Sequence, residues 1–210
     1  MVRKFAPTIL IGTAGEPGLF TETAIRDMAA RTPAPIIMPL SNPTAKAEAT
    51  PADILRWSEG RALVATGSPF GPVRIGGVSH QVGQANNMFI FPGVGLGAIV
   101  SRASEITDEM FGVAATTLAG LVRPDGVARG ALYPPIADLR RVSRAIAIAV
   151  ATQARQSGVA RLALDENIGK AVAAEMWLPS YPEALCGLDA NADGQAGYSL
   201  MDAGTQPDCP

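Results

Sequence analysis

The first third of the chain alternates short apolar runs with amphipathic segments, and this alternation limits the possible folds more than any other feature. Residues 8–12, 35–40 and 62–66 are apolar runs that predict buried strands. The segments between them, residues 21–30 and 50–57, predict helices. Thr21 or Thr23 is the expected cap of the first, and Thr50 followed by Pro51 marks the start of the second. This strand–helix order is typical of a parallel sheet with crossover helices.

From residue 91 onward the pattern becomes helical. The clearest helix is predicted over residues 135–157, where apolar residues recur at steps of three and four: Leu139, Val142, Ile146, Val150 and Ala154. Further helices are predicted over residues 93–103, 107–122 and 166–176.

These elements predict one main domain and a tail. We expect an incomplete doubly wound, Rossmann-like parallel sheet followed by C-terminal helices, together spanning residues 1–186. Residues 187–210 are polar and rich in glycine and aspartate, so we expect them to form a disordered tail.

The composition excludes several classes of protein. Apolar residues make up 48% and charged residues 17%, which is typical of a globular chain. A net charge of −2 gives no electrostatic basis for binding nucleic acid or an anionic membrane. No apolar run is long enough to span a membrane, and the N-terminus does not resemble a signal peptide. Because the two cysteines both lie near the C-terminal end, we expect a reducing, cytoplasmic setting.

The loops that follow the predicted strands are the first candidate for a ligand site. Residues 12–15 (GTAG), 41–44 (SNPT) and 67–70 (GSPF) are rich in small residues, hydroxyls and amides. Open α/β sheets bind ligands beyond the carboxyl ends of their strands, so these loops are predicted to meet at one site. The alternative is that they are ordinary turns between strands and helices.

The second candidate is the segment Gly83-Gln84-Ala85-Asn86-Asn87. Asparagine amides donate to carboxylates and accept from hydroxyls, which suits a hydroxy-acid substrate. Paired asparagines are also common turn formers, and that alternative stays open.

Three glycines in the segment Gly93-Val94-Gly95-Leu96-Gly97 imitate a dinucleotide-binding fingerprint. The third glycine comes one residue too early, and no acidic residue follows in the right setting. Close packing between helices is the better interpretation.

Three stretches resemble malic enzymes closely and in the same order. They are PLSNPTAKAEATPADILRWSEGRALVATGSPF, GQANNMFIFPGVGLGAIVSRASEITDEMFGVAATTLAGLV and LYPPIADLRRVS. The resemblance runs from about residue 7 to about residue 181. It is specific, because SNPT followed by Glu48, then GSPF, then an Asn-Asn pair ahead of Phe-Pro-Gly is not a general Rossmann pattern.

The resemblance implies roles for five residues. Asn42 is expected to contact substrate and the nicotinamide end of the cofactor. Asn86 and Asn87 are expected to include the amide that binds malate. Thr13 and Ala14 are expected to line the path of the cofactor. The family usually has Gly-Gln-Gly-Asn-Asn, so Ala85 is a departure, although it leaves both amides in place.

The resemblance also implies what this segment does not supply. Malic enzymes use a lysine base, a tyrosine acid and a carboxylate cluster that holds Mg²⁺ or Mn²⁺, and these are expected N-terminal to residue 8. The glycine fingerprint for the cofactor pyrophosphate is expected there too. We therefore assign no catalytic residue and no metal ligand to this chain, and the choice between NAD and NADP stays open.

The implied function is the oxidative decarboxylation of malate to pyruvate and CO₂ with reduction of NAD or NADP, as part of a longer or split enzyme. The expected partners are the missing N-terminal part and further copies in a homo-oligomer, and the isolated chain is expected to be inactive. Two alternatives remain: a non-catalytic remnant or partner-binding module, and an unrelated α/β binding domain.

Overall fold

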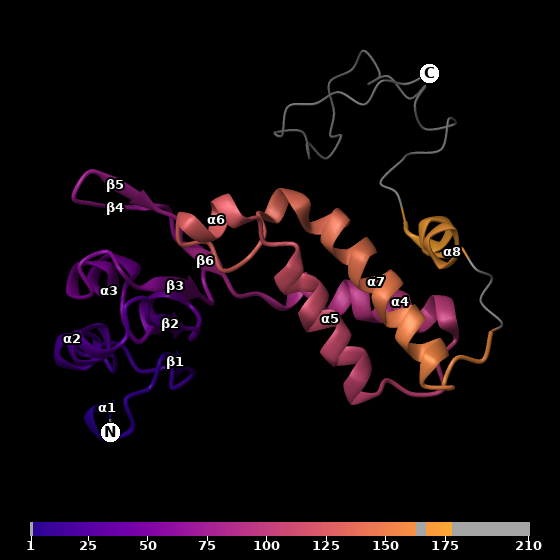
Figure 1. Ribbon diagram of the computed structural model, residues 1–210, viewed down its shortest axis with the longest axis horizontal. Helices are drawn as coiled ribbons and strands as arrows, with labels where there is room; N and C mark the ends of the chain where they lie inside the picture. The colour runs from indigo at the N-terminus through magenta and orange to yellow at the C-terminus, as the bar shows by residue number, and fades with distance from the viewer. Residues whose placement is uncertain (1, 163–166, 178–210) are drawn as a thin grey trace, which may run out of the picture. The chain divides into compact units, whose positions relative to one another are not determined.

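Residues 9–84 contain a four-stranded parallel sheet (Figure 1). The structure is a computed structural model that describes residues 2–162 and 167–177. The strands β1 (Ile9–Gly12), β2 (Ile36–Pro39), β3 (Leu63–Thr66) and β6 (Gly83–Gln84) lie in the order β1-β2-β3-β6. All three neighbouring pairs are parallel, so the carboxyl ends of the strands share one edge of the sheet. The predicted topology is confirmed.

Two crossover helices connect the first three strands. Helix α2 (Glu22–Arg31) begins after Thr21, whose side chain accepts a hydrogen bond from the main chain of Ala24. Helix α3 (Pro51–Trp57) begins after Thr50, which accepts from Asp53 N at 3.1 Å. Of the two candidate caps of α2, Thr21 is the one observed, and the predicted helix start at Thr50 is confirmed. Each threonine satisfies a donor that the first helical turn would otherwise leave unpaired.

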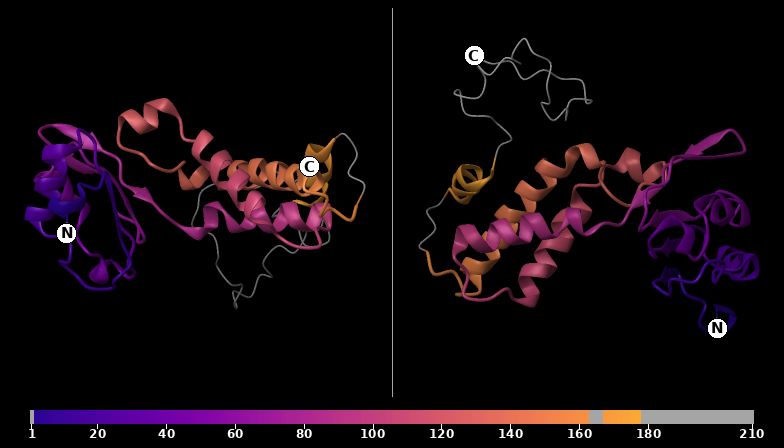
Figure 2. Two further views of the ribbon diagram at one scale, coloured as in Figure 1. Left: turned by 60° about the horizontal axis from the view of Figure 1, so that its bottom comes forward. Right: turned by 180° about the vertical axis from the view of Figure 1, so that it is seen from behind.

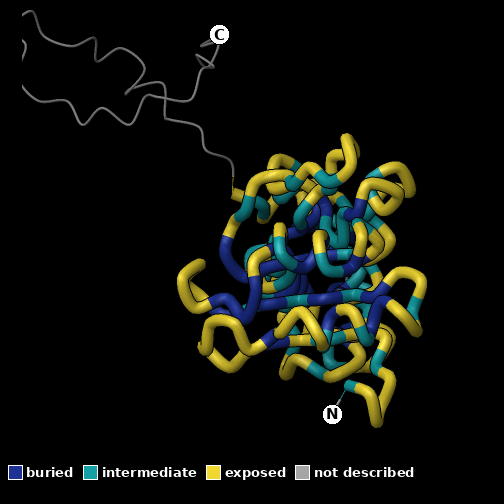
Figure 3. The backbone as a smooth tube through the Cα atoms, turned by 90° about the vertical axis from the view of Figure 1, so that its left-hand side faces the viewer, coloured by how far each residue is buried: buried dark blue, intermediate teal, exposed yellow. Residues whose placement is uncertain are grey.

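Both crossover helices pack on the same face of the sheet (Figure 1). Ile25 and Met28 of α2 and Ile54 of α3 form a buried cluster with Ile37 and Val64 of the sheet. Figure 3 shows such buried segments running through the interior, with exposed turns around them. Because side chains alternate along a strand, the opposite face of β1 presents Ile9 and Ile11 to solvent, 50% and 58% exposed.

Several short elements were not predicted from the sequence. A hairpin pairs β4 (Val73–Ile75) with β5 (Val78–His80), and its turn places Gly76 and Gly77 at φ +56° and +82°. Two glycines between alternating residues are a hairpin signal, so this element was predictable. The remaining missed elements are two to five residues long: β6, helices α1 (Val2–Phe5) and α6 (Pro124–Ala128), and 3₁₀ turns η1 (Thr44–Lys46), η2 (Asn87–Phe89) and η3 (Ile136–Asp138).

Four longer helices follow the sheet, as predicted: α4 (Phe91–Ser101), α5 (Asp108–Gly120), α7 (Leu139–Gln156) and α8 (Ile168–Glu175). Helix α7 begins four residues later than predicted, because η3 occupies the turn that follows Pro135. The predicted apolar face is buried at Val142, Ile146, Val150 and Ala154, while Leu139 is only partly buried. Helix α7 packs against both α4 and α5 (Figure 2).

Close approach of α4 to α7 depends on two glycines. A β-carbon on Gly93 would lie 2.6 Å from Ile146 Cβ, and one on Gly97 would lie 2.7 Å from Val150 Cβ. The middle glycine, Gly95, has nothing within 4 Å. The interpretation of this motif as a packing motif is therefore supported by the geometry of the two helices.

The predicted tail at residues 187–210 and the predicted domain end at residue 186 lie outside the described residues. In the part of the chain that the structure describes, no helix is both long and apolar enough to cross a membrane.

An added methyl group should have opposite effects on stability at Gly93, which packs against α7, and at Gly95, which has nothing within 4 Å of its β position. Gly93→Ala should lower the free energy of unfolding by about 1–3 kcal/mol, because the methyl group overlaps Ile146. Gly95→Ala, the matched control, should leave stability unchanged or raise it by about 0.5–1 kcal/mol, because alanine favours the helix. Urea unfolding measures both, and equal losses would contradict the packing described.

The exposed apolar face of β1 predicts self-association of this chain. β1 is an edge strand, and unpaired apolar edges pair with other chains. Light scattering over a concentration series should show an average mass that rises with concentration. Ile11→Lys should suppress that rise, whereas Ile136→Lys, at a residue 50% exposed in η3, should not. A concentration-independent monomer would contradict this prediction.

Candidate ligand site at the carboxyl edge of the sheet

Four loops meet the carboxyl edge of the sheet, one after each strand. They comprise residues 13–15, 40–44, 67–70 and 85–87. The second leads into the 3₁₀ turn η1, and the fourth leads into the 3₁₀ turn η2. The three loops predicted as a ligand site are thus brought to one edge, together with the Asn-Asn segment. Their side chains are small, amide-bearing, hydroxyl-bearing or apolar, with no ionisable group among them.

A buried carboxylate joins the first two loops. The side chain of Glu48 is fully buried, and its Oε1 accepts a hydrogen bond from Ala14 N at 2.8 Å and another from Ser41 Oγ. Its Oε2 lies 3.5 Å from Ser41 N, which donates to it. Ser41 Oγ in turn accepts from Gly15 N at 2.8 Å. Both carboxylate oxygens are therefore occupied by donors from the loops.

Gly12 leaves the space that this carboxylate fills. A β-carbon at Gly12 would lie 2.7 Å from Cδ of Glu48 and 2.7 Å from the ring of Phe20. The last residue of β1 therefore has to be a glycine for Glu48 to reach the loop after it.

The pKa of Glu48 lies below the ordinary value of a glutamate. Burial disfavours the charged form and by itself raises this pKa. The hydrogen bonds from Ser41 and from the main chain outweigh burial and lower it. Glu48 is therefore a charged, fully paired carboxylate, and it is not poised to exchange protons near neutral pH.

Asn42 is held by the third loop. Its Oδ1 accepts a hydrogen bond from Ser68 Oγ at 2.6 Å, and a cis peptide bond joins it to Pro43. A β-carbon at Gly67 would lie within 3.1 Å of Asn42 Nδ2 and closer still to the carbonyl of Leu40. Since Ser68 engages the oxygen, the orientation leaves the amide nitrogen of the exposed Asn42 as a donor for a ligand.

The two asparagines after β6 have different environments. Asn86 caps the 3₁₀ turn η2, because its Oδ1 accepts a hydrogen bond from Met88 N at 3.0 Å. Asn87 is exposed at the start of the same turn. Both line a cavity of about 500 Å³ whose other walls include Leu40, Leu118 and Tyr133. Asn86 therefore has a structural role at the start of η2, whereas the side chain of Asn87 is open to a ligand.

Ala85 fits its position without strain. Its φ is not positive, and its N–H donates to Thr66 O at 2.9 Å, which extends the pairing of β3 with β6. The departure from the usual glycine therefore leaves the Asn-Asn turn intact.

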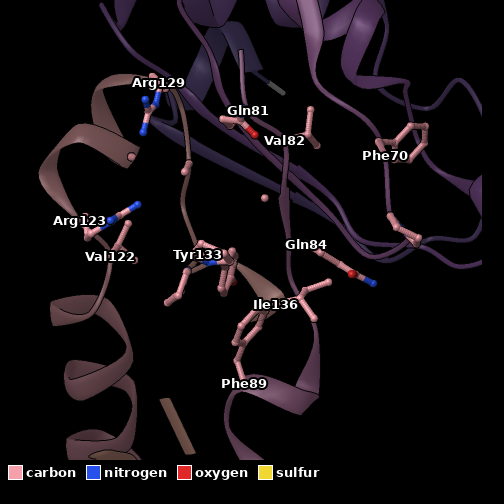
Figure 4. A pocket seen from close by; sticks show the side chains of 16 residues that line it. Phe70, Gln81, Val82, Gln84, Phe89, Val122, Arg123, Arg129, Tyr133 and Ile136 are labelled. Atoms are coloured by element: carbon pink, nitrogen blue, oxygen red, sulfur yellow. The ribbon is translucent and has the colours of Figure 1, made fainter. Parts of the chain in front are cut away.

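A second cavity, of about 280 Å³, borders the third strand-end loop through Pro69 and Phe70 (Figure 4). Its walls include Phe70, Val82 and Tyr133, with Tyr133 stacked on Phe89 at 5.9 Å between ring centroids. Burial raises the pKa of Tyr133. Two arginines that also line it, Arg123 and Arg129, both pair with Asp125. This pairing offsets much of the positive charge that an anionic ligand would need.

The backbone of the first loop is exposed. Thr13 and Ala14 are exposed, and Gly15 adopts φ +68° with nothing within 4 Å of its β position. No basic side chain stands in this loop. Within the described ranges, no three His, Cys, Asp or Glu side chains lie together as a metal site.

Sequence reasoning missed the residues that join the loops. Glu48 stood in the recognised motif but had no assigned role, and Ser41 and Ser68 were seen only as part of small-residue loops. The residues that flank Glu48 along the chain give no signal of this role, because its partner Ala14 lies 34 residues away and contributes only a main-chain N–H.

An open parallel sheet with amide-rich loops at its carboxyl edge defines an α/β protein of the class that binds ligands beyond its strand ends. Residues 1–155 match the family model for the NAD binding domain of malic enzyme. The chain belongs to the malic enzyme family.

Curated relatives agree with this assignment. The chain is 50% identical over 184 residues to an NAD-dependent malic enzyme of Sodalis glossinidius, covering 86% of this chain and 32% of the relative. It is 46% identical over 181 residues to an NAD-dependent malic enzyme of Pseudomonas aeruginosa, with the same coverage. The chain therefore spans about a third of the length of these relatives. An unrelated α/β binding domain is excluded.

Solved structures of malic enzymes share the fold. The malic enzyme of Pyrococcus horikoshii matches with a TM-score of 0.61 and 28% identity over 80% of this chain and 34% of that chain. The malic enzyme of Entamoeba histolytica matches with a TM-score of 0.64 and 27% identity over 80% and 31%.

The lowered pKa of Glu48 predicts how its contribution to stability depends on pH. Its charged form contributes stability that is fully present above the ordinary value of 4.5 and is lost as pH falls through the lower folded value. The chain should therefore be more stable than Glu48→Gln at neutral pH, and the difference should shrink on acidification below 4.5. Urea unfolding of both chains over a pH series measures this difference. A difference that widens on acidification would contradict the argument.

Proposed function

We propose that this chain forms part of the active-site cleft of an NAD-dependent malic enzyme, which oxidatively decarboxylates malate to pyruvate and CO₂. In that reaction bound NAD accepts the hydride from C2 of malate. The role of this chain is to bind and orient, because the loops at its carboxyl edge supply amides, hydroxyls and open backbone.

One observation carries the proposal: Asn42 is fixed by Ser68 with its amide nitrogen left free. An amide held at 2.6 Å through its oxygen presents its donor in one direction. We propose that Asn42 donates to malate beside the nicotinamide. Orientation of reactants by groups held in this way lowers the barrier to reaction by removing unproductive arrangements.

The substrate and cofactor residues are proposed as follows. Asn87 is the amide that binds a malate carboxylate, since it is exposed while Asn86 caps η2. Thr13 and Ala14 line the path of the cofactor, where exposed main chain follows β1. NAD rather than NADP is favoured by the names of the two relatives given above.

The acid, the base and the ligands of Mg²⁺ or Mn²⁺ are proposed to come from elsewhere in a complete enzyme, and a homo-oligomer is proposed for its assembly. Glu48 is a poor metal ligand because hydrogen bonds occupy both of its oxygens. The alternative is a non-catalytic remnant that keeps the fold and binds a partner.

A chimaera decides between these two functions. This chain should replace the corresponding 181 residues of the Pseudomonas aeruginosa relative, at 46% identity. We expect malate-dependent reduction of NAD by the chimaera in the presence of a divalent metal, and none by the 210-residue chain alone. Absorbance of the reduced nicotinamide measures both. A folded but inactive chimaera would favour the remnant.

Single substitutions in the chimaera test the amide roles. Asn42→Ala and Asn87→Ala should each lower kcat/KM for malate about tenfold to a hundredfold, because each leaves a substrate group without its partner, at a cost of about 1–3 kcal/mol. Asn86→Ala should lower thermal stability, because it removes the cap of η2.

Asn167→Ala is the matched control, since Asn167 caps α8 by accepting from Lys170 N. It should lower stability and leave kcat/KM unchanged. Unchanged kinetics in Asn42→Ala and Asn87→Ala alike would contradict the assignment of the site.

A further inference from the structure

Every hydrogen bond described here between the loop after β1 and the rest of the chain leads to Glu48. Ala14 N donates to its carboxylate directly, and Gly15 N reaches the same carboxylate through Ser41 Oγ. The far end of the loop is held as well, because Phe20 N donates to the carbonyl oxygen of Glu48 at 3.1 Å. One residue thus anchors both ends of a loop whose middle is exposed.

The same carboxylate holds the loop after β2. Ser41 donates to it from both its hydroxyl and its main-chain N–H, and Ser41 directly precedes Asn42. The first loop contains the proposed cofactor residues, and the second contains the proposed substrate amide. Glu48 is therefore the physical connection between the two halves of the proposed site.

Burial of Glu48 makes its hydrogen bonds to the two loops necessary. A fully buried carboxylate requires donors, because an unpaired charge in the interior costs several kcal/mol. Ala14 N and the two donors of Ser41 meet that requirement only when both loops lie in the observed positions. Displacement of either loop would remove one or two of the three donors from the buried charge.

We infer that Glu48 is a positioning residue, which sets the cofactor loop at residues 13–15 against the substrate amide of Asn42. The inference rests on the proposed function, and Glu48 acts through Ala14 and Ser41 without contacting the reactants. Its loss should therefore loosen the loop and weaken the affinity for NAD.

Hydrogen exchange at single amides of the 210-residue chain tests the connection itself. Glu48→Gln keeps the size of the side chain but removes the charge and one acceptor. The amides of Ala14 and Gly15 should then exchange at least about tenfold faster, since hydrogen bonds to charged groups are stronger than neutral ones. Exchange in α5 should not change.

Two further variants separate this connection from general destabilisation. Ser41→Ala keeps the carboxylate and removes the hydroxyl, so Gly15 should exchange faster while Ala14 stays slow. Ser41→Ala also decides the matter if Glu48→Gln does not fold. Glu105→Gln, at an exposed glutamate between α4 and α5, is the charge-matched control and should leave both amides unchanged.

The chimaera described above tests the consequence for the cofactor. Glu48→Gln should raise the KM for NAD about tenfold, in keeping with the loss of one charge-assisted hydrogen bond. A residue that served folding alone would lower the amount of active enzyme, and so the apparent kcat, without changing that KM.

The outcomes are distinct. Faster exchange at Ala14 and Gly15 together with a raised KM for NAD supports the inference. Unchanged exchange in both Glu48→Gln and Ser41→Ala overturns it, and so does an unchanged KM for NAD in an active chimaera. If the chimaera with the unaltered chain is inactive, the proposed function fails, and the exchange measurement still decides whether Glu48 sets the loop.

Discussion

The candidate site depends on one constraint, which is that a buried carboxylate must keep its hydrogen-bond donors. Glu48 is the one charged side chain among the buried residues that the structure describes, and its donors come from the loops after β1 and β2. The constraint extends to the sequence on both sides. Gly12 has to lack a side chain so that the carboxylate fits, and Ser41 has to carry a hydroxyl so that Gly15 is also held.

The helices after the sheet depend on a different constraint, the distance between two backbones. Gly93 and Gly97 allow α4 to approach Ile146 and Val150 of α7, and a methyl group at either glycine would overlap them. Dispersion and burial of apolar surface then stabilise the contact between α4 and α7. In both the sheet and the helices, glycines leave space for a large neighbouring side chain. At Gly12 the neighbour is the carboxylate of Glu48, and in α4 the neighbours are aliphatic side chains of α7.

The sequence predicted what periodicity and capping determine. Strands β1 to β3, their crossover helices with caps at Thr21 and Thr50, and the long helix α7 all follow from apolar spacing and turn chemistry. The two-residue strand β6 could not be predicted, because Gly83 and Gln84 have no apolar pattern and pair only through β3. The role of Glu48 could not be predicted either, since its partner Ala14 lies 34 residues away and contributes only a main-chain N–H.

The segments that directly follow the strands, residues 13–15, 40–44, 67–70 and 85–87, carry no ionisable side chain, and this bears on the proposed substrate. Malate is a dicarboxylate, and a free carboxylate beside it would repel it and compete for its donors. The carboxylate that joins the first two loops, Glu48, is buried and paired on both oxygens, so its charge is directed toward Ala14 and Ser41. Amides such as Asn42 and Asn87 can then hold a carboxylate or a hydroxyl without taking a proton from it. Under the proposed function, Glu48 gives the site rigidity while its charge is kept away from an anionic substrate.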